Sequence, residues 1–499
     1  EVSGSIPLPA TKIYMKKISI IIIISILLLS GVILIYKFTQ NSIIGKTDGN
    51  VQVLKKLIPN PIKNYLKQTI FKKEYSSKES EFNEKIIKKV HEDNVSLYEK
   101  KLSLIETLEI KSTKNQLYQL KKFSFPQLNT YAMGMKPPAY LGIFENYLII
   151  ATGKGDFLYV FLDELKNENP NFNLINTNFD ELIDKNKYIL PGLSAPRDIE
   201  IIDDNLFISY HDKNSCDKLS IAQAKIDINY LNFKQFFSWN ACVDKNFGFK
   251  KIDTLLDQQS GGRIRDFNEE NIIFTIGSYD EYSEEKSLTQ DMSSLFGSII
   301  RINKKTKKYQ ILSKGHRNQQ GLYFDQVNNF ILSTEHGPDG GDELNIINPR
   351  LKNIQNFGWP ISSYGEHYPS KHHDWKNMNR IDLMDKLAPL NKSHSDYGFI
   401  EPVKYWTPSI AVSEIIKIPV EFNPLFENDF FISSMGNVVA EGDHSIHHLR
   451  FNNKFQKIIF EDKIIIRERI RDIIYNTKDN SVILMLGNTP SLGILKQIN

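Results

Sequence analysis

A glycine-rich segment between strand-like runs decides the fold and the chemistry predicted for this chain. Residues 315–360 read GHRNQQGLYFDQVNNFILSTEHGPDGGDELNIINPRLKNIQNFGWP. In the loop 337–343, glycines and a proline turn the backbone so that carbonyl oxygens point inward, and Asp339, Asp342 and Glu343 add carboxylates. Carbonyl and carboxylate oxygens are the ligands that calcium prefers. Taken alone, such a loop is more often a plain polar turn between two strands.

A short pattern recurs on both sides of this segment. Each copy is an asparagine-containing turn followed by an apolar run that ends in small or polar residues. The copies are FENYLIIATG at Asn146, DDNLFISYHD at Asn205, EENIIFTIGS at Asn271, VNNFILSTEH at Asn329, FENDFFISSM at Asn428 and KDNSVILMLG at Asn480. They lie 52 to 99 residues apart, and the longest interval contains the glycine-carboxylate loop. Six such units predict an all-β fold, a six-bladed β-propeller whose blade loops converge at the axis.

The composition is that of a large globular protein with an uneven charge distribution. The 499 residues are 41% hydrophobic and carry a net charge of only +3. Lysines exceed acids over 51–125, whereas acids exceed basic residues over 126–499. Binding to phosphates needs clustered positive charge, so this distribution argues against nucleic acid as the partner of the body.

The N-terminal part predicts a membrane anchor and a spacer. Residues 18–36 are uncharged and follow Lys16 and Lys17, as in a single-pass signal anchor spanning about 15–37. A cleaved signal peptide is the alternative. We interpret 1–14 as a leader of unclear origin, 38–122 as a helical membrane-proximal stalk, and 123–499 as the propeller, on the extracytoplasmic (periplasmic) side of the cell membrane.

The chain has two cysteines, Cys216 and Cys242. In an exported protein they are candidates for one disulfide. Two unrelated buried thiols are the alternative, and their spacing gives no zinc signal.

Scarce arginines indicate an anion site. Only 11 of the 62 basic residues are arginines, and several lie in or beside the repeated units, namely Arg263, Arg317, Arg469 and Arg471. Arginine forks recognise carboxylates, so arginines that converge at a propeller axis would bind a ligand with several carboxylates. Surface salt bridges that tie blades together are the alternative. Among the histidines, His336 is a candidate for acid-base chemistry.

Several motifs in order resemble one family. GHRNQQGLYFD, EHGPDGGDELNIINP, NFGWPISSYGEHY, WTPSIAVSE and RIRDIIYNTKDN resemble the soluble quinoprotein glucose dehydrogenases and aldose sugar dehydrogenases, the glucose/sorbosone dehydrogenase family. The resemblance covers about residues 125–499. It implies a six-bladed propeller that uses pyrroloquinoline quinone (PQQ) and calcium to oxidise the CH–OH group of a sugar, with hydride transfer to the calcium-bound quinone. It does not indicate the electron acceptor.

The resemblance also implies roles for individual residues. Arg317 and Asn318 would hold the quinone, and Arg469 and Arg471 would bind its carboxylates. The carbonyls of Gly337 and Pro338 would bind the active-site calcium, a Lewis acid.

A second, structural calcium is also implied. Glu343 and the carbonyl of Phe357 would match its ligands. Asp342, in the same loop, is a further candidate metal ligand.

Two positions depart from the family pattern. Gln259 stands where the family has its general-base histidine, and an amide cannot accept the proton of a sugar hydroxyl. Asp257 and His336 are candidate substitutes. Met435 stands where the family has a cofactor-binding lysine. These departures leave two hypotheses open: a PQQ-dependent sugar dehydrogenase, or a catalytically decayed propeller that binds a glycan, a small anion or a protein partner.

Overall fold

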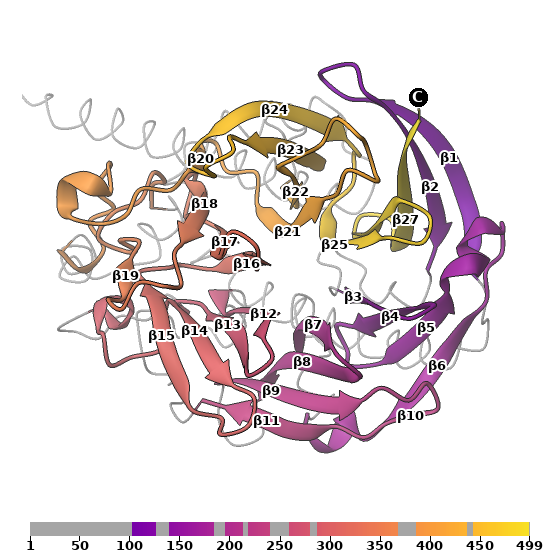
Figure 1. Cartoon of the computed structure of the whole chain (residues 1–499), viewed down its shortest axis with the longest axis horizontal. Coiled ribbons are helices and arrows are strands. Elements are labelled where there is room, and N and C mark those ends of the chain that lie inside the picture. The colour runs from indigo at the N-terminus through magenta and orange to yellow at the C-terminus, as the bar shows by residue number, and fades with distance from the viewer. Residues whose placement is uncertain are drawn as a thin grey trace, which may run out of the picture. The chain divides into compact units, whose positions relative to one another are not determined.

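The computed structural model describes residues 102–125, 139–183, 195–212, 218–239, 259–279, 287–367, 386–436 and 443–498. All of them belong to the compact unit Ile86–Asn499. Over these residues the strands form six sheets of four or five strands each. Figure 1 shows the sheets arranged in a ring around a common axis. The predicted six-bladed β-propeller is therefore confirmed.

The blades are numbered in chain order. Blade I contains β3 (Ala139–Phe144), β4 (Tyr147–Thr152), β5 (Phe157–Phe161), β6 (Phe172–Thr177) and β10 (Tyr230–Leu231). Blade II contains β7 (Pro196–Ile202), β8 (Asn205–Asp212), β9 (Lys218–Lys225) and β11 (Lys234–Ser238). Blade III contains β12 (Gly261–Asn268), β13 (Asn271–Ile276), β14 (Ser298–Asn303), β15 (Tyr309–Lys314) and β19 (Gln355–Asn356).

Blade IV contains β16 (Gln319–Asp325), β17 (Phe330–Glu335), β18 (Asp342–Ile347) and β20 (Lys404–Trp406). Blade V contains β21 (Val412–Ile418), β22 (Asp429–Ser434), β23 (Ser445–Phe451) and β24 (Ile458–Ile465). Blade VI contains β25 (Ile470–Asn476), β26 (Ser481–Leu486), β27 (Ser491–Ile498), β2 (Leu117–Ser124) and β1 (Ser103–Lys111). Short 3-10 helices occur at Leu162–Lys166, Phe179–Glu181, Leu288–Gln290 and Ser395–Tyr397.

The ring is closed by its inner strands and by apolar packing between blades. The inner strands β3, β7, β12, β16, β21 and β25 contact one another in cyclic order, and β25 contacts β3. A hydrophobic cluster lies between each pair of neighbouring blades, so the core consists of six layers rather than one centre. The hydrophobic effect thus holds blade to blade, while hydrogen bonds hold strand to strand.

The six repeated units correspond to the second strands of the six blades, β4, β8, β13, β17, β22 and β26. A short turn joins the second strand to the inner strand in five blades, whereas in blade V the longer segment 419–428 joins β21 to β22. Asn329 and Asn480 have φ values of 55° and 49°, a left-handed conformation that asparagine tolerates well. The recurring asparagines therefore mark the turn before the second strand of every blade.

The predicted boundary between stalk and propeller is wrong. Residues 103–111 and 117–122, which we expected at the end of a helical stalk, belong to the strands β1 and β2. Their Lys-, Glu- and Leu-rich composition is typical of a helix, but β2 has buried positions that suit a strand and pairs along its length with β27. Tertiary pairing overrides local propensity here.

The predicted leader, the anchor at 15–37 and the stalk before residue 102 lie outside the described residues, as do Cys216 and Cys242. Within the part that the structure describes, no helix has the length and apolar character to cross a membrane.

Candidate functional site

The predicted site residues gather at one end of the inner strands. Gln259 precedes β12, Arg317 and Asn318 precede β16, and Arg469 precedes β25. The glycine loop follows β17, whose other end begins at the hairpin turn of Asn329. The site is therefore on the propeller face opposite the asparagine turns, where loops before inner strands meet loops after second strands.

Hydrogen bonds join the site loops of blades III and IV. The Asn318 side-chain oxygen accepts from the Gly261 N–H at 3.2 Å, and its carbonyl accepts from the His336 N–H at 3.0 Å. The Arg317 carbonyl accepts from the Ser278 N–H at 2.7 Å. Asn318 is 2% exposed. These contacts hold Arg317 and Asn318, the predicted quinone-binding pair, in place. We call these two residues and their hydrogen-bonded neighbours the floor of the site.

Four arginines meet near the axis, and we call Arg197, Arg317, Arg469 and Arg471 the axial arginine cluster. Burial, together with the charges of Arg469 and Arg197, lowers the pKa of Arg471 to about 9. The Arg471 Nη1 atom donates to the neutral side-chain oxygen of Gln320 at 3.3 Å. Arg469 Nη1 donates to the backbone carbonyl of Met435. Positive charge is thus concentrated here beside neutral oxygens and one carboxylate, that of Asp443, which acts on Arg469. An excess of buried positive charge favours the binding of an anion.

Arg197 was missing from the predicted site. Its Nε and Nη2 atoms are buried and have no hydrogen-bond partner among the described residues. Gly262, with φ +108°, makes room for it, because a Cβ there would lie 2.5 Å from the Cβ of Arg197. Arg197 is the first arginine of an arginine-poor chain, and that scarcity was the signal that could have found it.

Arg263 does not join this cluster, although the sequence placed it there. Its side chain is 2% exposed, and Nη1 lies 2.9 Å from Asp198, 2.7 Å from Glu414 and 3.2 Å from Asp472. These carboxylates come from the inner strands of blades II, V and VI. Arg263 is therefore neutralised and ties four blades together at the axis. The alternative interpretation of the arginines expected such ties at the surface, whereas these ion pairs are buried.

The candidate bases are poorly suited to proton abstraction. The Gln259 carbonyl accepts from the Tyr279 N–H at 3.0 Å, which fixes this residue beside blade III. His336 Nε2 lies 2.6 Å from the Val412 carbonyl, to which it donates. Burial and the nearby arginines lower the pKa of His336 to about 3, so its imidazole is neutral but weakly basic. Asp257 lies outside the described residues.

A histidine that the sequence did not single out adjoins Gln259. His211, at the end of β8, is fully buried, and its Nε2 atom lies 3.1 Å from Ser260 Oγ. The His211 ring therefore supports the segment just before β12, which carries Gln259. Nothing in its sequence context distinguished it from a core histidine.

Met435 is buried, with 1% of its surface exposed. Its N–H donates to the Ala411 carbonyl at 2.8 Å. The side chain provides no charge, and this residue contributes its backbone carbonyl to Arg469.

Asp342 organises the glycine loop. Its carboxylate accepts from the Gly337 N–H at 3.0 Å and from the Ile410 and Val412 N–H groups at 3.1 Å each. Burial raises the pKa of Asp342 to about 6. These three backbone bonds give Asp342 a structural role in the loop, and its predicted metal ligation stays a prediction.

The calcium role of Gly337 and Pro338 remains a prediction. The Gly337 carbonyl accepts a hydrogen bond from Arg317 Nη1, which is also 3.1 Å from the His336 carbonyl. Over the described ranges, no group of three or more His, Cys, Asp or Glu residues could hold a metal ion. Backbone carbonyls are outside such a group, so the predicted ligand set is of a different kind.

The predicted second calcium site has a side chain between its two ligands. His394 Nδ1 lies 2.8 Å from the Phe357 carbonyl, and Nε2 lies 3.1 Å from Glu343 Oε1. His394 is 1% exposed and Glu343 is 4% exposed. Burial raises the pKa of Glu343 to about 7.

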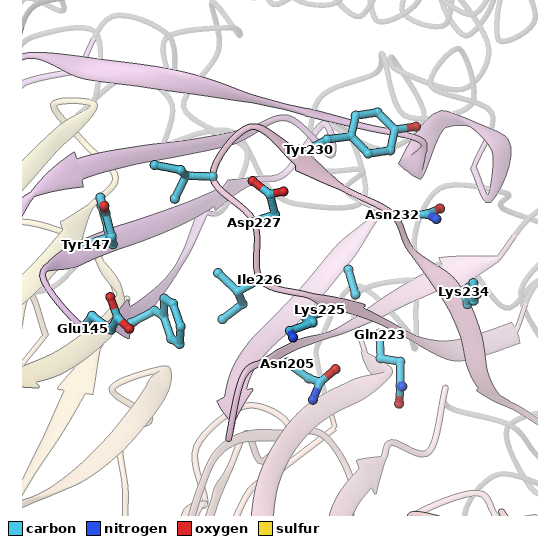
Figure 2. A pocket seen from close by; sticks show the side chains of 13 residues that line it. Glu145, Tyr147, Asn205, Gln223, Lys225, Ile226, Asp227, Tyr230, Asn232 and Lys234 are labelled. Atoms are coloured by element: carbon cyan, nitrogen blue, oxygen red, sulfur yellow. The ribbon is translucent and has the colours of Figure 1, made fainter.

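A cavity of about 770 Å³ lies elsewhere, between blades I and II. Its lining includes Tyr147 and Asn205, which start β4 and β8 at the hairpin face, and Gln223, Lys225 and Tyr230 (Figure 2). It contains none of the predicted site residues. We therefore locate the candidate active site from the convergent arginines and not from this cavity.

One family model and two curated proteins are similar to this chain in sequence. The sequence model of the family described as "Glucose / Sorbosone dehydrogenase" matches residues 206–492. An uncharacterised protein, slr1608 of Synechocystis sp., is 30% identical over 237 residues, which cover 43% of this chain and 50% of that protein. Aldose sugar dehydrogenase YliI of Escherichia coli K12 is 26% identical over 166 residues, which cover 31% of this chain and 40% of that protein. The chain thus spans half or less of the curated relatives it matches.

Solved structures share the fold. A glucose dehydrogenase crystal structure has a TM-score of 0.54 at 18% identity and covers 73% of this chain and 97% of that one. The soluble aldose sugar dehydrogenase of Escherichia coli in its apo-form has a TM-score of 0.53 at 16% identity and covers 79% and 99%. At these identities the similarity supports the propeller fold alone.

Proposed function

Since this chain belongs to the glucose/sorbosone dehydrogenase family, we propose that it is a PQQ-dependent oxidoreductase that oxidises the CH–OH group of an aldose-like sugar. The observation that carries this proposal is the axial arginine cluster. Its guanidinium groups meet at the propeller axis, and two buried nitrogen atoms of Arg197 have no partner among the described residues. Burial of cationic donors without a partner lowers the stability of the fold, unless a bound anion pairs with them.

The residues present fit a quinone that carries several carboxylates. Arg197, Arg469 and Arg471 would bind the carboxylates, and Arg317 and Asn318 would position the ring system. Arg317 also lies over the Trp359 ring, with its Cζ atom 5.2 Å from the centroid. This contact and the short bonds of Asn318 hold the floor before any ligand binds, which reduces the entropy lost on binding.

The fit to an active-site calcium rests on the carbonyls of Gly337 and Pro338. When bound, quinone and calcium would supply the hydride acceptor and its Lewis-acid activation. The chain's own part is to bind the sugar beside Gln259, to exclude water and to accept the hydroxyl proton. Among the described residues this last task has no strong base, because Gln259 is neutral and the pKa of His336 is about 3.

That gap favours a second candidate function. A propeller that retains the arginine cluster and lacks a base would bind a glycan, a small anion or a protein partner without turnover. We further propose, from residues 15–37, that the protein is anchored in the cell membrane with the propeller on the extracytoplasmic side.

A titration with cofactor separates the two candidates. The full chain is purified in detergent, given calcium, and titrated with PQQ while quinone absorbance is followed. Dye reduction is then measured with a panel of aldoses and other alcohols. Arg471→Gln is expected to weaken quinone binding about ten- to hundredfold, because it removes a buried charged contact. Arg301→Gln is the matched control, since Arg301 contacts Gln310 on the outer part of blade III.

Gln259→His tests the missing base. If the wild type binds quinone with little turnover and Gln259→His raises turnover by about 10²- to 10⁴-fold, the cradle is intact and the base has been lost. If neither protein binds quinone, the dehydrogenase proposal is wrong.

A further inference from the structure

We propose that the side chain of His394 takes the place of the second, structural calcium. The imidazole ring would therefore occupy this position instead of a bound metal. The proposal concerns the disagreement between the calcium ligands that the sequence predicts and the contacts that the structure shows. It depends on the position of one ring and not on sugar oxidation.

The imidazole fills the space that a shared cation would need. Its two nitrogens lie 2.8 Å from the Phe357 carbonyl and 3.1 Å from Glu343 Oε1, so the ring spans the gap between the two predicted ligands. Ser362 Oγ is a further neighbour, 2.9 Å from Nδ1. Calcium takes six to eight oxygens at about 2.3–2.6 Å. A calcium ion within that distance of the Phe357 carbonyl and of Glu343 would overlap the ring.

The neighbouring backbone is adapted to this ring. Gly358 has φ +92°, and a Cβ there would lie 2.9 Å from His394 Nδ1 and 2.1 Å from Ser362 Oγ. A side chain at Gly358 would therefore displace the imidazole. The Tyr364 ring packs on the other side, with its centroid 5.3 Å from that of His394.

The segment that carries His394 is docked on the loop that carries Phe357. The Asn391 N–H donates to the Ile361 carbonyl at 2.9 Å, and the Ile400 N–H donates to the Asn356 carbonyl at 2.9 Å. The Ser395 N–H donates to Glu401 at 2.8 Å. These bonds fix the backbone before and after His394 in sequence, so the position of the ring follows from the backbone.

The carboxylate of Glu343 also has partners other than His394. Asn345 Nδ2 donates to Glu343 Oε2 at 3.2 Å and to Glu335 Oε1 at 3.3 Å. Glu335 in turn lies 3.1 Å from His316 Nδ1. Two buried glutamates thus face two buried histidines across one asparagine, and every carboxylate has a partner from the chain itself.

A count of metal and cofactor tests the proposal. The full chain is loaded with calcium and PQQ, excess is removed, and calcium per chain is measured by atomic absorption while quinone per chain is measured by absorbance. We expect no calcium beyond the amount of quinone, and we expect Glu343→Gln to leave the calcium content unchanged. His394→Ala is expected to gain about one calcium per chain, which the double variant with Glu343→Gln loses.

The counts also keep this proposal separate from the dehydrogenase proposal. A chain that binds no quinone and no calcium contradicts the proposed function but supports the His394 proposal. One calcium per chain in excess of quinone in the wild type, removed by Glu343→Gln, would overturn the His394 proposal. The calcium content of the wild type, compared with that of Glu343→Gln, decides the proposal even if His394→Ala fails to fold.

Discussion

Replacement of Arg263 by methionine tests how the propeller is held at its axis. The substitution keeps a long apolar side chain and removes a guanidinium that contacts carboxylates from blades II, V and VI. Loss of one partner of a buried ion pair costs about 3–5 kcal/mol, because the remaining charges stay buried. With an unfolding entropy of about 2.1 cal/mol/K per residue over roughly 400 residues, this corresponds to a Tm lowered by about 4–6 °C.

The pH dependence of this loss identifies its cause. Burial raises the pKa of Asp472 to about 7, and removal of Arg263 is expected to raise it further. A carboxyl whose folded-state pKa exceeds its unfolded value binds more protons when folded, so the free energy of unfolding falls as pH rises between those values. The loss of free energy of unfolding that Arg263→Met causes, relative to the wild type, should therefore become smaller as the pH falls from 8 to 5.5.

Urea unfolding at both pH values measures this deficit. The exposed Arg350 provides the control, and Arg350→Met is expected to stay within about 0.5 kcal/mol of the wild type. A deficit for Arg263→Met below about 1 kcal/mol at pH 8, or one that grows on acidification, would refute this account of the axis.

Three further changes test other parts of the propeller. Gly358→Ala is expected to destabilise by about 1–3 kcal/mol more than Gly398→Ala, because both have positive φ but only the first adds a Cβ that collides, 2.1 Å from Ser362 Oγ; equal losses in urea unfolding would contradict this. Asp342→Asn should cost about 1–3 kcal/mol, since an amide oxygen replaces a carboxylate that accepts three backbone N–H bonds; a loss below about 0.5 kcal/mol by the same assay would argue against that role. Burial lowers the pKa of Lys314 to about 7, so the unfolded chain binds more protons above that pH, and the stability of the wild type relative to Lys314→Met should rise from pH 7 to 9; a flat difference in thermal unfolding would count against it.

The fold was predictable where the signal is local and repeated. A turn asparagine followed by a buried second strand occurs in every blade, so six copies predict six blades without any knowledge of pairing. The strands β1 and β2 were missed because their lysines and glutamates are typical of a helix. Their strand character depends on pairing with each other and on the pairing of β2 with β27, far away in sequence.

The site was predictable only where a residue type is scarce or a motif is specific. Arg317, Arg469 and Arg471 were found, and the structure brings them together. The roles of Arg263 and Arg197 depend on which inner strands face one another across the axis, a property that no local pattern contains. His394 was not identified at all, because its contact with Phe357 joins residues 37 positions apart across an insertion.

Blade VI joins segments from the two ends of the described residues in one sheet, in the order β1-β2-β27-β26-β25. This sheet can form only after β27 has been synthesised, because β27 is the strand that pairs β2 with the rest of the blade. Ser112 and Asp462, 350 residues apart, are hydrogen-bonded at 2.6 Å, as are Lys122 and Glu468, 346 residues apart, at 2.9 Å. The propeller should therefore fold slowly. A nascent propeller that lacks β27 would expose the apolar edges of two blades, where chaperones could bind or aggregation could start.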